Sequence, residues 1–583
     1  MEFTIEHPKN HHPPSILQGA NYPPLRYKTL GEILDEQAEL RGDNEAIICP
    51  SINSRWSYNK LQREALQVAQ GLFAFGIRPG DRIGILAGNC AEYVAVFFAA
   101  GYIGAILVVL NNTYTTQEAM NALSHSDCRL LFTVPKIGRM SLRGLVNELG
   151  PRPQEHGRSK TLENVVMLRH ALGGFMTYSN LKDEGRKLGP EPLERIAVYP
   201  DDTCNLQYTS GSTGHPKAAM LTHFNLINNA TSIGDRLDFT EEDILCCPPP
   251  LFHCFGLVLG VLAVLTHGAK IVLPAETFDA TAVLKAISEE NCTALHGVPT
   301  MFEEILSLPR PEGWNCDALR TGIIAGAPVP VPLMRRLLSE LGMSEFTSSY
   351  GLTEASPTCF NAFTADTVDT RLTTVGRLLP HLKAKIIDTT GAIVPLGSRG
   401  ELCIAGYSLQ KGYWNNSVET AEVMKRDENG ILWLHTGDEA SFTEDGGCTI
   451  TGRFKDIIIR GGENIYPVEI EARLGQHPQI NRAVVIGVKH PKYGELVGAF
   501  LQHVDSSVCT RTNLSLGDIR EWTRKTLGRH KAPAHVFWFG EEGVPAEVPQ
   551  TGSGKVKKPD LRILAEKVVA ARAGADESVK ARL

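Results

Sequence analysis

Residues 209–217 read Thr-Ser-Gly-Ser-Thr-Gly-His-Pro-Lys, a run that combines four hydroxyl side chains with two glycines and a lysine. Hydroxyl and backbone N–H groups donate hydrogen bonds to phosphate oxygens, and a lysine adds a positive charge. Glycine tolerates positive φ angles and lets the backbone approach a ligand closely. The run therefore predicts a loop that wraps a polyphosphate, formed by Thr209, Ser210, Gly211, Ser212, Thr213, Gly214, His215, Pro216 and Lys217.

Two other interpretations can be compared with this run: a P-loop, which the sequence does not match, and a surface turn, which stays open. The P-loop pattern G-x-x-x-x-G-K-[ST] carries a hydroxyl for Mg²⁺ after its lysine, but here Pro216 precedes Lys217 and Ala218 follows it. A surface turn rich in serine and glycine fits the composition, although Lys217 and the flanking Tyr208 and His223 count against it. The remaining sequence has to distinguish a phosphate loop from a surface turn.

The composition is typical of a soluble globular enzyme. Of 583 residues, 43% are apolar and 21% are charged, and this length corresponds to about three or four domains. The net charge of −7, without a long basic run, argues against a nucleic-acid partner. The thirteen cysteines include no C-x-x-C pair, so we expect no zinc site, no disulfide framework and a reducing compartment.

One uncharged stretch, residues 93–110, is long enough to be tested as a membrane span. Gly101 and Gly104 divide it into a helix-like part and a β-branched part, as in a helix and a strand buried in an α/β sheet. The first residues lack the basic region and apolar core of a secretory signal. We therefore expect neither a transmembrane segment nor a secretory signal.

Helical patterns alternate with short β-branched runs over residues 30–145 and 205–350, and the runs include Arg82–Leu86, Ile106–Leu110, Ile271–Leu273 and Thr321–Ile324. Such alternation predicts an α/β fold whose mostly parallel sheets are covered by helices. Short strands and frequent Gly turns over residues 370–450 predict a small antiparallel, β-barrel-like unit. We place a boundary at residues 453–456 and predict an irregular N-terminal segment (1–29), a large domain (30–453), a small α+β C-terminal domain (454–565) and a tail (566–583).

Four further segments carry polar groups that suit a nucleotide, although each alone is more typical of a strand end, a turn or a surface loop. In Ser349–Glu354, a hydroxyl and a carboxylate can together hold a phosphate oxygen and Mg²⁺. In His435–Asp438, the acid after a Gly turn can accept both hydroxyls of a ribose. Gly461–Asn464 is a flexible turn, and Gln550–Lys555 places a second lysine on a loop of glycine and serine.

Taken in order, these segments resemble the adenylate-forming (AMP-binding) superfamily of acyl-CoA synthetases, luciferases and peptide-synthetase adenylation domains. The resemblance runs from about residue 30 to residue 565 and rests on 209–217, Pro250–Gly256, Gly326–Pro328, Tyr350–Glu354, Thr436–Asp438, Gly452–Arg453, Gly461–Glu463 and Lys555. Within the superfamily the chain is most similar to medium-chain acyl-CoA synthetases, through Ile457–Arg460 followed by Gly461–Pro467, and through Gly297–Phe302.

The resemblance implies an ATP-dependent acyl-CoA ligase. A carboxylate first attacks the α-phosphate of MgATP, which yields acyl-adenylate and pyrophosphate, and the CoA thiol then displaces AMP. The implied cofactor is Mg²⁺, with ATP, CoA and a hydrophobic carboxylic acid, of medium chain length or specialised, as substrates. The alternative is an enzyme that passes the acyl group to a carrier protein or another acceptor.

The resemblance also implies a nucleotide site drawn from several segments. The loop 209–217 would hold the β- and γ-phosphates. Thr353 would contact the α-phosphate, and Glu354 would hold Mg²⁺. Asp438 and Arg453 would bind the ribose. The adenine would lie against Gly326, Ala327, Pro328, Ser349, Tyr350 and Gly351.

In the C-terminal domain, Lys555 would bridge the carboxylate and α-phosphate oxygens and stabilise negative charge in the first step. Lys455 would be the hinge about which this domain turns as a mobile lid. After the turn, CoA would meet Gly461, Gly462, Glu463, Lys531, Ala532 and Pro533. The implied catalytic set is Lys555, Thr353, Glu354 and His253.

The expected acyl pocket consists of Phe255, Gly256, Gly260, His296, Gly297 and Val298. The helix after His253 carries no charge, and its glycines at 256 and 260 could leave a narrow apolar slot, which favours a hydrophobic acid. Phe252 and His253 stand where peptide-synthetase domains have Phe-Asp, so an amino acid substrate is disfavoured. A lone histidine in an apolar run, such as His253, is otherwise typical of a satisfied core residue.

The sequence ends in Ala581-Arg582-Leu583, which resembles the small–basic–Leu peroxisomal address. Chance is the alternative, since three residues make a weak pattern. We expect a peroxisomal location, with the cytoplasm otherwise, and an import receptor as partner. Fatty acid metabolism or the biosynthesis of a secondary metabolite would be the context.

Overall fold

The computed structural model describes residues 13–155, 157, 159–189, 193–209, 216–326, 329, 331–461, 463–504, 514–552 and 554–580, without the side chains of residues 194 and 573–580. The chain forms two compact units, which we describe separately. The large unit takes its residues from Met1–Lys385, Cys403–Thr436 and Thr443–Cys448, and the small unit from Ile386–Leu402, Gly437–Phe442 and Thr449–Leu583. The units thus interleave along the chain, whereas the sequence predicted a single division at residues 453–456.

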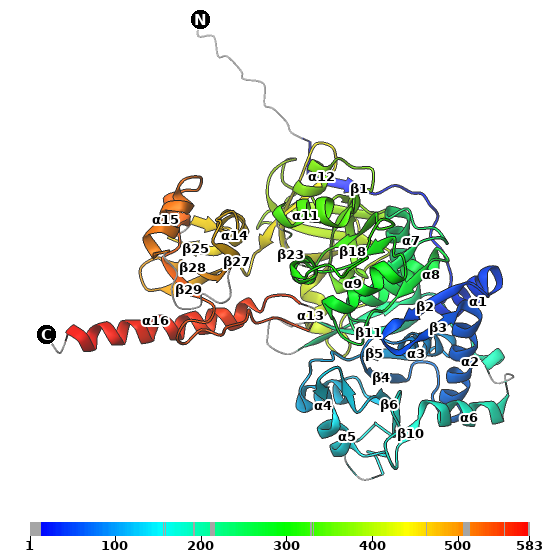
Figure 1. The fold of residues 1–583 in the computed structure, drawn as a ribbon. Coiled ribbons are helices and arrows are strands. Elements are labelled where there is room, and N and C mark those ends of the chain that lie inside the picture. The colour runs from blue at the N-terminus through cyan, green and yellow to red at the C-terminus, as the bar shows by residue number, and fades with distance from the viewer. Residues whose placement is uncertain are drawn as a thin grey trace, which may run out of the picture. The chain divides into compact units, whose positions relative to one another are not determined.

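A seven-stranded sheet in the large unit has the order β10-β9-β6-β4-β5-β11-β12. Its neighbours are parallel except for the antiparallel pair β11·β12. Helices α2 and α3 lie beside its strands β4 and β5 (Figure 1). The strands are β4 (Arg82–Leu86), β5 (Ile106–Val109), β6 (Cys128–Thr133), β9 (Asn164–Met167), β10 (Met176–Thr177), β11 (Thr203–Thr209) and β12 (Lys217–Thr222). The helices are α2 (Tyr58–Ala74), α3 (Ala91–Tyr102), α4 (Thr116–His125), α5 (Arg143–Leu149) and α6 (Tyr178–Leu188), and β7 (Lys136–Ile137) pairs with β8 (Met140–Ser141).

The uncharged stretch 93–110 becomes the buried helix α3 followed by the buried strand β5. The break falls at Gly104, whose φ of 64° lies in the region that glycine tolerates best. Among the described residues, none of the helices combines the length and the apolar character that a membrane crossing requires.

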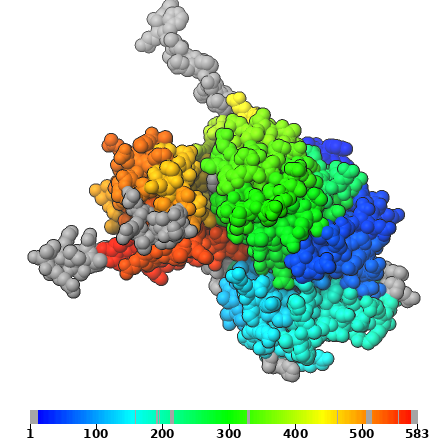
Figure 2. Space-filling view, in the orientation of Figure 1, coloured from blue at the N-terminus to red at the C-terminus, as the bar shows by residue number. Residues whose placement is uncertain are grey.

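A nine-stranded sheet, also in the large unit, has the order β19-β18-β17-β16-β15-β13-β14-β2-β3. Its central strands are parallel and its outer pairs are antiparallel. The strands are β2 (Glu45–Cys49), β3 (Ser54–Ser57), β13 (Ile244–Cys246), β14 (Lys270–Val272), β15 (Ala294–Leu295), β16 (Thr321–Ile324), β17 (Glu345–Gly351), β18 (Thr358–Asn361) and β19 (Arg377–Leu378). Figure 2 shows the first described residues, in blue, adjoining the middle of the chain, in green, in agreement with the pairing of β2 with β14.

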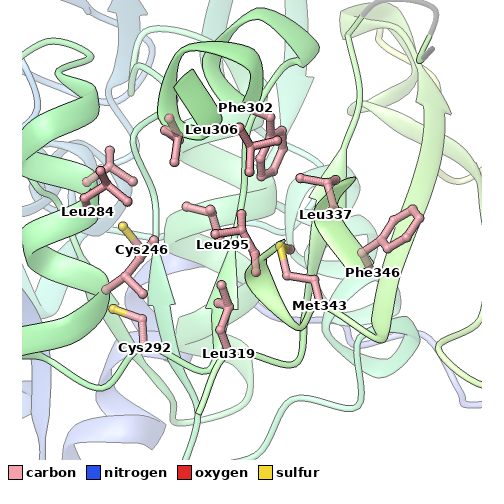
Figure 3. Close-up of a cluster of buried hydrophobic side chains, with 14 of the residues drawn as sticks. Cys246, Leu284, Cys292, Leu295, Phe302, Leu306, Leu319, Leu337, Met343 and Phe346 are labelled. Carbon is pink, nitrogen blue, oxygen red and sulfur yellow. The ribbon is translucent and has the colours of Figure 1, made fainter. Parts of the chain in front are cut away.

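Helices cover this second sheet, as the alternating pattern predicted. They are α1 (Leu30–Arg41), α7 (His223–Arg236), α8 (Ala263–Thr266), α9 (Ala280–Glu289), α10 (Pro299–Ser307), α11 (Val331–Leu341) and α12 (Val368–Thr373), with the π-helix η3 (Phe255–Leu262). The large unit also contains the short 3₁₀ turns η1 (Pro50–Ile52), η2 (Leu193–Arg195), which contacts α2, and η4 (Thr353–Ala355). An apolar core joins helices to strands, and Figure 3 shows Leu295 of β15 near its centre, between Leu284 of α9 and Phe346 of β17. The predicted α/β class with mostly parallel sheets is confirmed.

Short strands bounded by glycine turns over residues 382–453 form a third sheet of order β1-β20-β21-β23-β22, with β24 paired to β23. They are β1 (Ile16–Gln18), β20 (Leu382–Ile387), β21 (Gly400–Gly406), β22 (Met424–Arg426), β23 (Leu432–Phe442) and β24 (Cys448–Arg453), with α13 (Ser417–Val423) between β21 and β22. The N-terminal segment, expected to be irregular, contributes β1, which pairs antiparallel with β20. Its partner lies hundreds of residues away, so the local composition could not reveal it.

The small unit contains a five-stranded sheet of order β26-β25-β28-β27, with β29 paired to β28. Alternate residues of β27 belong to two apolar clusters, Val485 to one and Val484 and Ile486 to the other, so both faces of the sheet are covered. The elements are β25 (Ile458–Arg460), β26 (Glu463–Ile465), α14 (Pro467–Leu474), β27 (Ile480–His490), β28 (Gly494–His503), α15 (Leu516–Arg524), η6 (Arg529–Lys531), β29 (His535–Trp538) and α16 (Lys558–Lys580). The predicted tail is helical as far as residue 580 because α16 continues through it, and Ala581, Arg582 and Leu583 lie outside the described residues.

Candidate active site

The predicted phosphate loop connects two strands of the large unit. Thr209 ends β11 and Lys217 begins β12, and the two residues face each other in the antiparallel ladder. A P-loop instead leads from a strand into a helix, so the structure excludes that interpretation on connectivity as well as on sequence. Pro216 is exposed. Ser210, Gly211, Ser212, Thr213, Gly214 and His215 lie outside the described residues.

Glu354 lies beside the base of this loop. Its Oε1 atom accepts hydrogen bonds from the Thr209 hydroxyl at 3.4 Å and from the Tyr413 hydroxyl at 2.8 Å. Burial and the neighbouring Glu354 raise the pKa of the Tyr413 phenol, so this group keeps its proton and donates. The structure therefore joins two predicted site residues, Thr209 and Glu354, and adds Tyr413, which the sequence analysis missed.

Lys217 is held by an acidic partner. Its Nζ atom lies 3.0 Å from Oε2 of Glu419, and the two side chains are 10% and 14% exposed. The Asn416 side-chain amide donates to the same Glu419 oxygen at 2.9 Å. The Lys217 Nζ atom also lies 5.2 Å from the centre of the Tyr413 ring, a cation–π distance. Glu419 and Asn416 are further site neighbours that no motif in the sequence had marked.

The segment expected to line the adenine forms the end of β17. The Ser349 hydroxyl donates to the Phe360 carbonyl at 3.3 Å, and the Tyr350 ring packs against the Phe360 ring at 6.5 Å. A Cβ atom on Gly351 would lie 2.0 Å from the Pro357 carbonyl oxygen, so glycine is required for the approach of the two strands. Gly326 has a φ of 88°, Thr353 begins η4, and Ala327 and Pro328 lie outside the described residues.

In the small unit, the predicted ribose pair is in contact. Nε of Arg453 donates to Oδ1 of Asp438 at 2.8 Å. Asp438 is only 4% exposed, whereas the Arg453 side chain is 58% exposed. The preceding Gly437 lies inside strand β23 with a φ of 69°, so the expected glycine turn is a local deformation of a strand. The arginine thus holds a nearly buried carboxylate in one orientation.

Lys455 and Lys555 also lie in the small unit. The Lys455 carbonyl accepts a hydrogen bond from Arg562 of α16, and Arg562 also donates to Asp456. Lys555 closes a tight turn, because the Thr551 N–H donates to its carbonyl at 2.7 Å and its own N–H donates to the Thr551 hydroxyl at 3.1 Å. Gly554 in this turn has a φ of 81°. Backbone groups of both lysines are thus hydrogen-bonded within the small unit.

The residues predicted to meet CoA are distributed over β26, η6 and the turn before β26. Lys531 forms a short ion pair with Glu469, and Glu463 lies 3.6 Å from His530. The Gly461 N–H donates to the Tyr493 carbonyl, and its φ is 60°. The Ala532 and Pro533 side chains are buried, and Gly462 lies outside the described residues.

His253, from the implied catalytic set, and His296, from the expected acyl pocket, have structural partners. Nδ1 of His253 accepts from the Phe255 N–H at 3.1 Å, at the start of η3. His296 is fully buried, with Nδ1 accepting from the Ile323 N–H at 3.2 Å and Nε2 lying 3.1 Å from the Leu259 carbonyl. Burial lowers the pKa of His296 to about 4, so the ring is neutral and Nε2 carries the proton. It ties η3 to β16, and Phe255 packs on it at 5.7 Å.

The narrow slot expected beside Gly256 and Gly260 is filled. A Cβ atom on Gly256 would lie 2.4 Å from the Pro250 carbonyl oxygen, and one on Gly260 would lie 2.6 Å from Sγ of Cys247. The expectation of an open slot was wrong, because the spacing of Gly256 and Gly260 identifies a helix face without side chains but does not reveal which atoms pack against that face. Among the other pocket residues, Phe255 and Val298 are nearly buried, and a Cβ atom on Gly297 would lie 2.9 Å from the Phe302 ring.

A cavity of about 510 Å³ lies elsewhere in the large unit. None of the predicted site residues that the structure describes lines it. Its walls are His381, Lys383, Ala405, Gly406, Leu409, Gln410, Lys411, Met424, Ile431 and Leu432.

Known proteins resemble this chain over most of its length. A family model described as AMP-binding enzyme matches residues 34–414, and one described as AMP-binding enzyme C-terminal domain matches residues 469–555. The chain is 60% identical over 585 residues to the acyl-CoA ligase sidI of Aspergillus fumigatus, which covers 100% of this chain and 99% of that protein. It is 34% identical over 565 residues to the mitochondrial medium-chain acyl-CoA ligase ACSF2 of Danio rerio, which covers 95% of this chain and 91% of that protein. The crystal structure of the anthranilate CoA ligase AuaEII with anthranoyl-AMP superposes with a TM-score of 0.80 at 25% identity, covering 94% of this chain and 99% of that one.

Proposed function

The chain belongs to the AMP-binding enzyme family and is an AMP-forming acyl-CoA ligase, and we propose how its residues divide the two steps and which acid it takes. In the first step, the acid attacks the α-phosphate of ATP, and pyrophosphate leaves with its bonding electron pair. In the second step, the CoA thiol attacks the acyl carbonyl, and AMP leaves. Phosphoryl chemistry of this kind depends on positioning and charge stabilisation rather than on a covalent enzyme group.

One observation carries the assignment of the polyphosphate site: Thr209, Glu354, Tyr413 and Lys217 converge at the base of the loop. A cation and a carboxylate at the same loop are the groups that a metal-bound polyphosphate needs. The Glu354 carboxylate and the Thr209 hydroxyl are hard oxygen donors, which suit Mg²⁺. Bound Mg²⁺ would supply neutralisation of phosphate charge. In this proposal Glu354 holds the metal, and Lys217 contacts the β- and γ-phosphates.

The remaining roles follow the same proposal. Asp438, fixed by Arg453, accepts hydrogen bonds from the ribose hydroxyls. Thr353 contacts the α-phosphate, and Lys555 stabilises the charge that develops there in the first step. Lys455 serves as the hinge of the small unit, and Gly461, Glu463 and Lys531 face CoA in the second step.

We further propose that the acid is a medium-chain aliphatic acid or one of similar hydrophobicity. Helix η3 is buried and carries no charged side chain, so this helix provides no carboxylate to pair with an ammonium group. The relative from Danio rerio is named a medium-chain acyl-CoA ligase. The His253 ring accepts a hydrogen bond from the Phe255 N–H where η3 begins, and in this proposal it lies at that end of the acyl site.

Pyrophosphate release across a panel of acids, with and without CoA, tests this function. We expect turnover with octanoate and decanoate, little with acetate or phenylalanine, and an acyl-CoA product identified by mass. If an acid caused pyrophosphate release but CoA neither accelerated it nor gave an acyl-CoA thioester, the result would contradict an acyl-CoA ligase. Activity confined to acetate or amino acids would contradict only the substrate class.

We propose a peroxisomal location from the final Ala581-Arg582-Leu583. A fluorescent protein fused to the N-terminus of the chain should appear in peroxisomes, and deletion of the three residues should return it to the cytoplasm. Cytoplasmic fluorescence of the intact fusion would contradict the proposal.

A further inference from the structure

Glu419 competes with the expected phosphates for the same lysine. Its carboxylate lies 3.0 Å from Nζ of Lys217, and both side chains are largely buried. An ion pair that is shielded from water is screened little by salt. The positive charge that the loop would offer to ATP is therefore already neutralised by the protein.

The carboxylate is fixed by its own helix. Asn416 precedes α13, and its side-chain oxygen accepts from the Glu419 N–H at 3.1 Å while its side-chain amide donates to Oε2 of Glu419 at 2.9 Å. This reciprocal pair restrains both the backbone and the side chain of Glu419. Glu419 is thus held through both its backbone and its carboxylate, next to the Lys217 ammonium group.

The segment before α13 is joined to the strand that carries Lys217. The Trp414 N–H donates to the Ala218 carbonyl at 2.8 Å, and the Met220 N–H donates to the Gly412 carbonyl at 3.0 Å. These backbone bonds keep Glu419 beside β12. Tyr413 contacts both Lys217 and Glu354, because the face of its ring lies against the Lys217 ammonium group and its hydroxyl donates to the Glu354 carboxylate.

We propose that Glu419 is a positioning residue that holds Lys217 in the nucleotide-free enzyme and is exchanged for the polyphosphate when ATP binds. ATP then gains the lysine only after the internal ion pair has broken, which weakens its apparent affinity. The same competition returns Lys217 to Glu419 when pyrophosphate forms, so it favours pyrophosphate release. This inference rests on the proposed function of Lys217 as a phosphate-binding residue.

The test uses the full-length protein with Glu419→Gln, which keeps the shape of the side chain and removes its charge. We expect the Kd for ATP without acid, measured by calorimetry, and the KM for ATP to fall about ten-fold, the change that corresponds to about 1.4 kcal/mol. Inhibition by pyrophosphate should strengthen by a similar factor. A general loss of structure would weaken binding, so it would not produce tighter binding of both ATP and pyrophosphate.

Two further variants complete the experiment. Glu422→Gln, on the exposed face of the same helix, is the matched control and should leave all three constants unchanged. Glu419→Asp keeps the charge but places it farther from Lys217, and its Kd for ATP should lie between those of the wild type and Glu419→Gln. It serves as the test if a thermal melt shows that Glu419→Gln is unstable.

The outcomes separate the inference from the proposed function. A Kd for ATP that is unchanged or raised in a folded Glu419→Gln or Glu419→Asp protein would overturn the competition. A wild-type protein that binds ATP but releases no pyrophosphate with any acid would overturn the proposed function instead, and the binding constants would still report on Glu419.

Discussion

The Tyr413 hydroxyl donates a 2.8 Å hydrogen bond to the same Glu354 oxygen that accepts from Thr209. The hydroxyls of Thr209 and Tyr413 thus both orient the Oε1 atom of Glu354, and neither of them donates to Oε2. In the proposed function Glu354 holds Mg²⁺, and since a metal ligand needs a defined orientation, Tyr413 would act on that metal through Glu354.

Tyr413→Phe removes this bond and leaves the ring. We expect the Mg²⁺ concentration for half-maximal pyrophosphate release to rise about ten-fold, within the 10–100-fold range typical for loss of an outer-shell partner. Tyr199→Phe, at a side chain that is 63% exposed, is the control. A Mg²⁺ dependence identical to wild type would show that Tyr413 does not orient a metal ligand.

Asp438→Asn keeps the volume of the buried side chain but removes its charge. We expect the KM for ATP to rise by about ten-fold to a hundred-fold, because hydrogen bonds to a charged group contribute about 1.5–3 kcal/mol. The Kd for CoA should not change. A normal KM for ATP together with a lowered melting temperature would assign Asp438 and Arg453 a purely structural role.

Lys555→Ala should abolish acyl-adenylate formation and spare thioester formation from supplied acyl-adenylate, since the proposal assigns its charge to the first step only. The two half-reactions are measured separately, by pyrophosphate release and by CoA consumption. Lys557→Ala, at an exposed lysine two residues further on, is the control. Equal loss of both half-reactions would contradict this division of roles.

Gly256→Ala tests whether the glycines of η3 serve packing. The added Cβ atom would lie 2.4 Å from the Pro250 carbonyl oxygen, so we expect a loss of about 1–3 kcal/mol in the free energy of unfolding, typical of overpacking. Gly173→Ala, which meets no heavy atom within 4 Å, should be neutral. If Gly256→Ala left the stability unchanged but shifted the preference to shorter acids, the result would instead support the apolar slot that the sequence predicted.

His296 makes the stability of the large unit sensitive to acid. Its folded pKa of about 4 lies below the unfolded value of about 6.5, so the unfolded chain binds the proton first as the pH falls. The stability is therefore complete above pH of about 6.5 and declines toward pH 4, by up to about 3 kcal/mol. His223, whose pKa burial also lowers to about 4, adds a second decline of the same sign.

Urea unfolding at pH 7.5 and pH 5 measures this effect. His296→Asn should lower stability at pH 7.5 and reduce the difference between the two pH values. His170→Asn, at an exposed histidine, should keep the wild-type difference. An unchanged difference in His296→Asn would contradict the assignment to this ring.

The layers of the fold could be predicted because each β-branched run and each helical pattern is local. Arg82–Leu86 and Thr321–Ile324 coincide with β4 and β16. Glu354 and Asp438 could be named as candidate site residues because they stand in short segments whose order resembles that of the family, and their roles stay predictions. Tyr413 and Glu419 could not, since they reach the site through backbone pairing with β12, and no spacing in the sequence encodes that pairing.

Strand β1 has a practical consequence for work on this chain. Residues 16–18 cover the free side of β20 by pairing with residues 383–385. An exposed strand edge is a template for pairing with another molecule. Truncations that start after residue 18 would uncover this edge and invite aggregation, so shortened proteins should begin before Ile16, and affinity tags should leave that strand intact.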